Sequence, residues 1–327
     1  MIVLLSFPLA FISYRIIEEP FRRKTFISQK KLFIYALIGT LFFFIIGLIG
    51  HISNGFDKRD FFGLSLSGNN AYGGGGYEWS GVSKRSGDLN VLLYGDSHAL
   101  QIAPSLDSLF AFEEASFAWI LQSACMSLPG IYNQYKKERK KCQEKLDRLY
   151  KNLYDIDYLI IAYRYSKNIM DRGNKVVGLV TESSVAQHAV ITSIEKLVKS
   201  LPKKTKLVIV GNVPTSNLIS EGGYLKCRMK KMISECGGEF SIEKGELYKF
   251  NQNLEKYASK SKDSKVIFID PYKKLCKNER CIVRKGDKLF YSDHAHLSKW
   301  GAKLLAQEII DKIYFNHNQA KSLIYEN

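Results

Sequence analysis

Two short stretches, far apart in the chain, carry the side chains best suited to acyl transfer or ester hydrolysis. VLLYGDSHA at 91–99 places Ser97 just after an apolar run, and SDHAHLSKWGA at 292–302 carries Asp293 and His296. A serine hydroxyl becomes a good nucleophile only when a base removes its proton. In a D-x-x-H turn the carboxylate can accept from one ring nitrogen while the other nitrogen faces the serine. The two stretches therefore predict a Ser-His-Asp triad.

The other histidines suit the role of base less well. His98 directly follows the serine, and we expect its side chain to point away from that of Ser97 if the turn leads into a helix. His294 lies in the same turn as His296 but lacks the D-x-x-H spacing. The remaining three fall near an apolar run, within an expected helix and in the tail: His51, His188 and His317. The alternative is that GDSH is only a turn and D-x-x-H only a helix cap.

An alternation of strands and helices is expected to position these residues. Amphipathic helical patterns separate most of a series of short apolar runs, and a further helix follows Ser298. This order is typical of a three-layer α/β domain with a mostly parallel five-stranded sheet. Catalytic groups in such sheets gather beyond the carboxyl ends of the strands, where Ser97 falls. The expected strands are 89–94, 116–121, 158–163, 206–210 and 265–269, and the clearest helices are 138–153, 184–200 and 246–259.

The amino-terminal fifty residues differ from the rest. The uncharged apolar run at 32–50 is long enough to cross a bilayer, so it is interpreted as a transmembrane helix; the alternative is a buried core helix. A shorter apolar run at 1–13 lacks the basic leader and cleavage site of a signal peptide. Basic residues between the two runs place this connector in the cytoplasm and everything after His51 outside it. These residues are Arg15, Arg22, Arg23, Lys24, Lys30 and Lys31.

Six cysteines follow the apolar helix and fit an oxidising compartment. Their spacing predicts the disulfides Cys276–Cys281 and Cys227–Cys236, and by elimination Cys125–Cys142. Six cysteines allow about fifteen pairings, so proximity alone supports this choice. No histidine stands beside them at zinc-finger spacing, and no metal site is expected. Reduced buried thiols would be favoured only if the membrane topology were inverted.

The net charge of +16 requires a nucleic-acid partner to be considered. Part of this charge lies in the cytoplasmic connector, and much of the rest lies in helical runs such as KKERKK at 136–141. Such runs are more often solvated faces, and no nucleic-acid motif is present. We therefore expect no nucleic-acid partner. The segment 52–86, rich in Gly, Ser and Asn, is expected to be a linker or a loosely ordered extension packed on the domain.

GDSH at 95–98 and DHAH at 293–296 resemble the first and last blocks of the SGNH (GDSL-type) hydrolase family, which has an α/β fold and acts on esters. The family's third block, G-x-N-D, is missing, and IIAYRYSKN at 160–168 resembles instead the block of SGNH domains fused to membrane acyltransferases. The resemblance implies oxyanion donors at the backbone N–H groups of Ser97 and Ala124, the latter where a glycine is usual. Arg164 is a further candidate for oxyanion or substrate binding, or it forms a structural ion pair.

The amino terminus resembles a second family. SYRIIEEPFRRK at 13–24 is similar to the end of the last conserved helix of the acyltransferase family 3 membrane domain. In fused members one more transmembrane helix leads to a periplasmic SGNH domain. The expected organisation is therefore the end of that membrane domain (1–23), a cytoplasmic connector and transmembrane helix (24–51), a linker (52–86), an SGNH domain (87–316) and a tail (317–327).

Together the resemblances imply an O-acyltransferase, most simply an O-acetyltransferase, that modifies a cell-envelope glycan such as O-antigen. They imply a bacterial inner-membrane protein whose SGNH domain lies in the periplasm. No cofactor is expected on the outer domain, and acetyl-CoA would be the ultimate donor through a complete acyltransferase membrane domain. That domain would be a missing amino-terminal part or a separate chain. The alternatives are a carbohydrate esterase and a non-catalytic glycan-binding accessory subunit.

Overall fold

The chain forms two compact units, Met1–Arg59 and Asp60–Asn327, each described here by itself. The computed structural model describes residues 2–19, 28–52, 60–61, 64–65, 72–75, 77–83, 87–113, 115–133, 139–165, 168–171, 176–180, 182–215, 238–242, 244–261, 265–286 and 288–325.

The first unit is helical. It contains α1 (Ile2–Ser13), the π-helical turn η1 (Tyr14–Glu18) and α3 (Gln29–Ile52). Within the described residues, α3 is the one helix long and apolar enough to cross a membrane, over Phe33–Ile52, and none of that stretch is buried. A helix whose apolar side chains are exposed all round suits lipid rather than water. The predicted apolar helix is thus confirmed.

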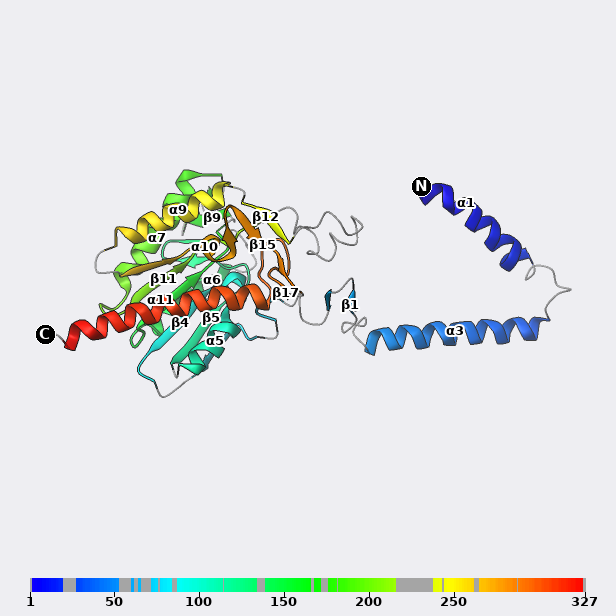
Figure 1. Cartoon of the computed structure of the whole chain (residues 1–327), viewed down its shortest axis with the longest axis horizontal. Helices are drawn as coiled ribbons and strands as arrows, with labels where there is room; N and C mark the ends of the chain where they lie inside the picture. The colour runs from blue at the N-terminus through cyan, green and yellow to red at the C-terminus, as the bar shows by residue number, and fades with distance from the viewer. Residues whose placement is uncertain are drawn as a thin grey trace. The chain divides into compact units, whose positions relative to one another are not determined.

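The second unit is built on a six-stranded sheet (Figure 1). Five neighbouring strands are parallel and match the five predicted ones. Their central residues are apolar and most of them are buried, as expected for strands with helices on both faces. The strand order is β13-β11-β8-β4-β5-β3. The bounds of the parallel strands are Asn90–Gly95 for β4, Ser116–Leu121 for β5, Tyr158–Ala162 for β8, Lys206–Val210 for β11 and Val266–Ile269 for β13.

The sixth strand corrects the sequence prediction. β3 (Ser80–Ser83) runs antiparallel to β5 at the edge of the sheet and comes from the segment expected to be a linker or a loosely ordered extension packed on the domain, where no strand was predicted. Its sequence, SGVS, has a single apolar residue, so no periodic pattern announces it. Gly81 is needed there, because a Cβ would lie 2.2 Å from the ring of Trp119.

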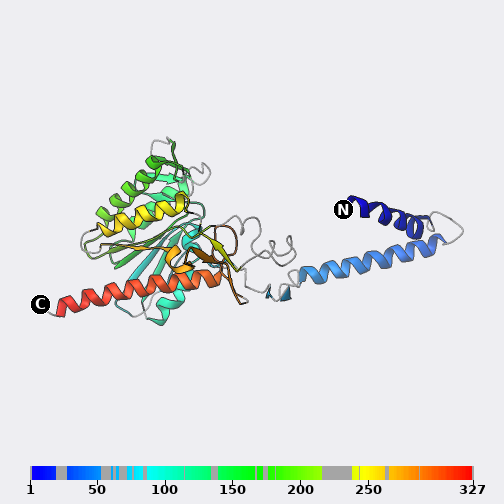
Figure 2. The same ribbon diagram turned by 45° about the horizontal axis from the view of Figure 1, so that its top comes forward.

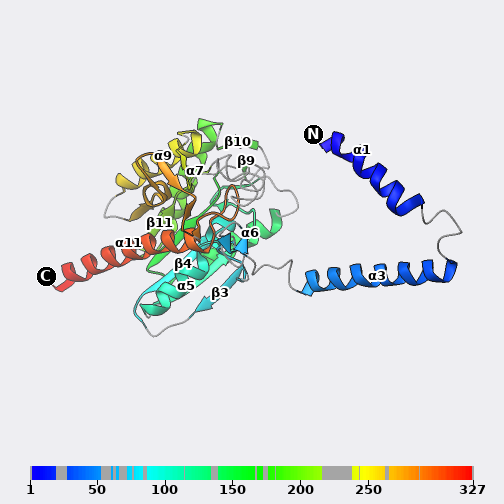
Figure 3. The same ribbon diagram turned by 45° about the vertical axis from the view of Figure 1, so that its right-hand side comes forward.

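Helices cover both faces of the sheet. In Figures 2 and 3, α5 (Ala103–Phe112) and α11 (Lys299–Tyr325) lie on one face, whereas α7 (Ser184–Ser200) and α9 (Glu246–Ser259) lie on the other. Two hydrophobic cores form, one on each face of the sheet. α6 (Arg139–Lys151) packs with α7 and α9 in the second of these cores. Because strand residues alternate between faces, neighbouring leucines of β4 enter different cores. α11 continues well past residue 316, where the sequence suggested the beginning of a tail.

Short antiparallel strands form smaller sheets that are separate from the main sheet. One group, in the order β10-β9-β7-β6, comprises Val176–Leu179, Asn168–Asp171, Ile131–Asn133 and Ser127–Leu128. A second group, β12-β15-β14, comprises Glu239–Ser241, Arg280–Ile282 and Cys276–Lys277. Two hairpins pair β1 (Asp60–Phe61) with β2 (Leu64–Ser65) and β16 (Arg284–Lys285) with β17 (Lys288–Leu289).

Two predicted disulfides are present. Cys276–Cys281 joins β14 to β15, and Cys125–Cys142 joins the loop after β5 to α6. The third predicted pair, Cys227–Cys236, lies outside the described residues. Both observed bonds belong to the unit that was expected to lie outside the cytoplasm.

Candidate active site

The turn after β4 presents Ser97 at the carboxyl edge of the sheet. Asp96 caps the short helix α4 (Ser97–Leu100), and its Oδ1 accepts the backbone N–H of His98 at 2.8 Å. A glycine is required just before it, because a Cβ on Gly95 would lie 2.0 Å from the Ala162 carbonyl oxygen. The backbone N–H of Arg164, just beyond β8, donates to the same Asp96 carboxylate at 3.1 Å. Asp96 therefore connects the serine turn to the end of the neighbouring strand β8.

The structure brings the three predicted triad residues together. Nε2 of His296 lies 2.9 Å from Oγ of Ser97, and Nδ1 of His296 lies 2.9 Å from Oδ2 of Asp293. With the proton on Nδ1, this nitrogen donates to the carboxylate and Nε2 is free to accept from the serine hydroxyl. The arrangement has the geometry that general-base activation of a nucleophile needs.

The Asp293 carboxylate is held in its charged form. Burial alone would raise the pKa of this carboxyl, but hydrogen bonds from the His296 ring and from the Ala295 and His296 backbone, with the His296 charge, outweigh it. Its pKa therefore lies below the ordinary value. The two backbone N–H groups each donate to Oδ1 at 2.8 Å, which fixes the carboxylate beside Nδ1 of the ring.

A buried glutamine joins the two halves of the site. Oε1 of Gln101, in the turn after α4, accepts the backbone N–H of Leu297 at 2.8 Å. Ser298, fully buried, donates its hydroxyl to the Leu289 carbonyl and precedes the first turn of α11. Gln101 thus fixes the serine turn to the histidine turn, and Ser298 anchors the histidine turn to β17.

Tyr72 completes the wall beside the histidine, a role that the sequence did not reveal. Its hydroxyl donates to the backbone carbonyl of Ser97, and its ring meets the His296 ring edge-on, with centroids 5.2 Å apart. Burial, followed by the charges of Asp96 and Asp293, raises the pKa of Tyr72 well above its ordinary value, so the hydroxyl stays protonated. A Cβ on Gly73 would lie 2.2 Å from the Gln101 carbonyl oxygen, which shows how closely this segment packs.

Two further histidines flank the base. The ring of His98 is buried, with its centroid 5.1 Å from that of His296, so it stays beside the site although α4 is helical. His294 is half-exposed, and its Nε2 lies 3.4 Å from Nη2 of Arg164. The predicted residue Arg164 therefore reaches the rim of the site next to the triad.

The loop after β5 carries Ala124, the predicted second oxyanion donor. Because β4 and β5 are adjacent and parallel, this loop emerges beside the serine turn, and the N–H of Gln122 donates to the Gly95 carbonyl at 3.1 Å. Ala124 has a left-handed backbone, with φ of 53°, which favours glycine. A glycine at this position would adopt that conformation without strain.

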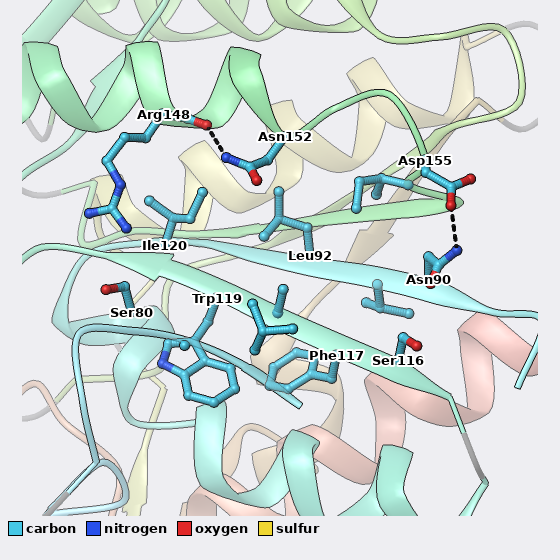
Figure 4. A pocket seen from close by; sticks show the side chains of 15 residues that line it. Ser80, Asn90, Leu92, Ser116, Phe117, Trp119, Ile120, Arg148, Asn152 and Asp155 are labelled. Carbon is cyan, nitrogen blue, oxygen red and sulfur yellow. Dashed lines mark hydrogen bonds between the residues drawn. The ribbon is translucent and has the colours of Figure 1, made fainter. Parts of the chain in front are cut away.

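A groove lies away from the triad, on the α6 side of the sheet. It has a volume of about 490 Å³ and runs between α6 and the strands β3, β4 and β5. In Figure 4, Ile120 and Leu92 lie on the α6 side, below Arg148 and Asn152, while Phe117 and Trp119 lie on the opposite side. None of the triad residues lines this groove.

No grouping of three or more His, Cys, Asp or Glu side chains suited to a metal ion occurs among the residues that the structure describes.

Comparisons with known proteins identify the family of the domain. Residues 68–311 match the model of a family described as SGNH domain (fused to AT3 domains). No curated protein matches the chain. The periplasmic domain of a lipopolysaccharide acetyltransferase from Salmonella ser. Paratyphi A aligns at a TM-score of 0.52 and 17% identity, covering 71% of this chain and 85% of that domain.

Two further solved structures align at lower scores. One, described as a platelet activating factor from Streptococcus pneumonia, has a TM-score of 0.42 and 17% identity, covering 70% of this chain and 86% of its own. The other, described as a GDSL-like lipase from Parabacteroides merdae, has a TM-score of 0.35 and 14% identity, covering 67% and 93%. Because the family model spans most of the chain, this protein belongs to the family of SGNH domains that are fused to AT3 domains.

Proposed function

We propose that this protein is a membrane-anchored O-acyltransferase that places an acyl group, most simply acetyl, on a hydroxyl of a cell-envelope glycan. The observation that carries the proposal is the hydrogen-bonded series Ser97–His296–Asp293, with 2.9 Å at each of the two contacts. Membership of a family fused to acyltransferase domains and the fold shared with the periplasmic domain of a lipopolysaccharide acetyltransferase support transfer to a glycan.

In the first half-reaction the Ser97 hydroxyl attacks the carbonyl carbon of the acyl donor. His296 accepts the hydroxyl proton on Nε2 and delivers it to the departing group of the donor. The bond to the departing group breaks as the serine ester forms. Asp293 accepts from Nδ1 throughout and stabilises the positive charge that the ring carries between these two proton transfers.

In the second half-reaction a sugar hydroxyl replaces the departing group. His296 takes the sugar proton, the sugar oxygen attacks the serine ester, and the proton returns to Oγ of Ser97. The products are an acylated glycan and the free serine.

The backbone N–H groups of Ser97 and Ala124 are proposed to bind the oxyanion in both half-reactions. They belong to adjacent loops at the same edge of the sheet, as the β4–β5 pairing requires. Loss of one such donor typically raises the barrier by about 3 kcal/mol. Arg164, whose guanidinium reaches the rim beside His294, is a candidate contact for the acceptor or the oxyanion.

The proposed setting is the bacterial inner membrane, with α3 crossing the bilayer and the SGNH domain in the periplasm. The exposed apolar face of α3, the basic residues before it and the two disulfides after it support this topology. A complete acyltransferase membrane domain is the proposed partner, since the resemblance at 13–24 covers only the end of one. Acetyl-CoA is the proposed ultimate donor, with no cofactor held by the outer domain.

Ester hydrolysis is the second candidate function, because the same triad can activate water in place of a sugar hydroxyl. A glycan-binding accessory role would require the triad to be silent. A serine-directed fluorophosphonate tests this last alternative, since an active triad must label at Ser97.

The proposed function is tested with the full chain, co-expressed with an acyltransferase membrane domain of the same family. Glycan acetylation is measured by mass spectrometry for the wild type, Ser97→Ala and Ser80→Ala, the last removing a serine that lines the groove of Figure 4. We expect acetylation to be lost in Ser97→Ala and retained in Ser80→Ala. Unchanged acetylation in a folded Ser97→Ala variant would refute the assignment of the nucleophile.

Hydrolysis of an aryl acetate, with and without added glycan, separates the two enzymatic functions. An acyltransferase diverts the acetyl group to the glycan as acceptor concentration rises, whereas an esterase releases acetate at the same rate. Acetate release that ignores the glycan would favour the esterase.

A further inference from the structure

A buried lysine of α6 bridges the two loops that flank the active site. Lys145 is only 3% exposed. Its Nζ donates to the backbone carbonyl of Gly95 and, at 3.2 Å, to that of Cys125. The same ammonium lies over the ring of Tyr94, 4.3 Å from its centroid. Buried lysines are rare, and this one is held by two carbonyls and an aromatic face.

The two bridged carbonyls stand next to the proposed oxyanion donors. Gly95 lies two residues before Ser97, and Cys125 directly follows Ala124. The two loops have no long stretch of backbone between the lysine contact and the donor. Moving either carbonyl would therefore move a donor N–H.

The Ala124 loop needs such support. A left-handed backbone at a residue with a Cβ costs about 1 kcal/mol or more and persists where the surroundings hold it. Two groups of α6 provide that hold, because Cys142 binds Cys125 covalently and Lys145 donates to its carbonyl. The two α6 residues are three apart and so lie on the same face of the helix.

The charge of Lys145 also faces the serine turn. Burial lowers the pKa of Lys145 to about 7, and the charge of Asp96 acts in the opposite direction. Asp96 itself accepts the N–H groups of His98 and Arg164. An amine donates in either protonation state, so the bridge does not depend on the charge.

We infer that Lys145 is the positioning residue of the oxyanion hole. By donating hydrogen bonds to the Gly95 and Cys125 carbonyls, it sets the distance between the N–H donors of Ser97 and Ala124. The inference rests on the proposed function, since it takes Ser97 as the nucleophile. It assigns to α6 a role that no residue of the triad performs.

The test compares Lys145→Met with Arg148→Met in the full chain in detergent. Arg148 lies three residues further along the same helix and lines the groove of Figure 4, so its replacement is a matched control. Aryl acetate hydrolysis is followed at several substrate concentrations. Misplaced oxyanion donors are expected to lower kcat by about 10²-fold with KM within about twofold, because the donors act mainly in the transition state. Arg148→Met is expected to keep both constants.

Lys145→Gln keeps a side-chain nitrogen that can donate to a carbonyl and is expected to give an intermediate kcat. Hydrogen exchange of residues 95–98 and 122–126 provides a readout that does not depend on activity. Faster exchange in both segments of Lys145→Met, with wild-type exchange in Arg148→Met, is expected. A Lys145→Met variant with wild-type kcat, or with wild-type exchange in both segments, overturns the inference.

The outcome for Ser97→Ala distinguishes the two levels of the argument. If Ser97→Ala loses hydrolysis and Lys145→Met keeps it, the inference fails and the proposed nucleophile stands. If Ser97→Ala hydrolyses the aryl acetate like the wild type, the proposed function fails. Faster hydrogen exchange in Lys145→Met alone would then show that Lys145 stabilises the two loops but has no role in catalysis.

Discussion

The carboxyl edge of the sheet and the groove beside β3 differ in what their polar groups do. In the groove, polar side chains pair with nearby partners: Asn152 donates to the Arg148 carbonyl at 2.7 Å and Asn90 to Asp155 at 3.4 Å. At the edge, a hydroxyl, an imidazole and a carboxylate form a directed series that ends on the serine oxygen.

This difference shows that volume is a poor guide to chemistry in this molecule. The groove is spacious and its printed hydrogen bonds are structural, whereas the edge places the hydroxyl of Ser97 within proton-transfer distance of the His296 ring. α6 serves both regions, since Lys145 points under the edge and Arg148 lines the groove. Substitutions of Lys145 and of Arg148 should therefore differ in their effect on catalysis.

Among the changes that keep the nucleophile, the largest expected effect comes from breaking the series at Asp293. Asp293→Asn keeps the size of the side chain but no longer holds the imidazole in the tautomer that accepts from Ser97. We expect kcat for aryl acetate hydrolysis to fall by about 10⁴-fold with little change in KM. A loss below tenfold, in a variant whose unfolding temperature is that of the wild type, would mean that another group orients His296.

A stability measurement sharpens the comparison along α6. With the pKa of Lys145 lowered to about 7, the unfolded chain binds more protons than the folded chain between about pH 7 and the ordinary lysine pKa of about 10.4. Stability should therefore rise with pH over this window, by a few kcal/mol at most.

The unfolding temperature from pH 7 to 9.5 should accordingly rise more steeply for the wild type and Arg148→Met than for Lys145→Met. Other groups contribute to each curve, so the difference between the curves is the quantity to measure. Parallel curves for all three proteins would contradict a depressed pKa at Lys145.

A smaller effect is expected from the wall of the site. Tyr72→Phe keeps the ring against His296 and removes the hydrogen bond to the Ser97 carbonyl. A hydrogen bond of this kind is worth about 1 kcal/mol, so kcat should fall roughly fivefold. Tyr77→Phe, which removes the bond from that hydroxyl to Asp107 at 2.9 Å, is the control and should keep kcat. Equal kcat values for the two variants would mean that the Tyr72 hydroxyl does not contribute to catalysis.

The smallest effect is expected from filling the groove. Ala118 is partly exposed there, and Ala118→Leu would occupy part of the space next to α6. Aryl acetate hydrolysis and glycan acetylation should both stay within twofold of the wild type. A selective loss of glycan acetylation would break the comparison, because it would place the acceptor in the groove.

The parts of the fold and site that the sequence predicts are those carried by local pattern. The five parallel strands are continuous apolar runs, and α7 and α9 begin and end at the predicted residues. The triad followed from the two motifs at 95–98 and 293–296, each confined to a single turn. A hydroxyl beyond a buried strand and a D-x-x-H turn before a helix need no tertiary information to be noticed.

The missed features depend on packing between distant segments. β3 and Tyr72 lie in a stretch with little periodicity, and their places are set by β5 and the catalytic turns. Lys145 was not singled out from the sequence because it is one of several basic residues in α6. The buried positions Cys142, Lys145, Leu146 and Leu149 nevertheless follow the helical repeat, and this spacing could have placed the lysine on the inner face.

The edge strand β3 has a consequence for where this chain can be shortened. β3 pairs with β5 along four residues and covers its outer backbone groups. A protein that began at Gly87 would lose this cover and leave a hydrophobic strand open to pairing with other molecules, which invites aggregation. A soluble form that stays monomeric should therefore retain the residues from Tyr72 onward.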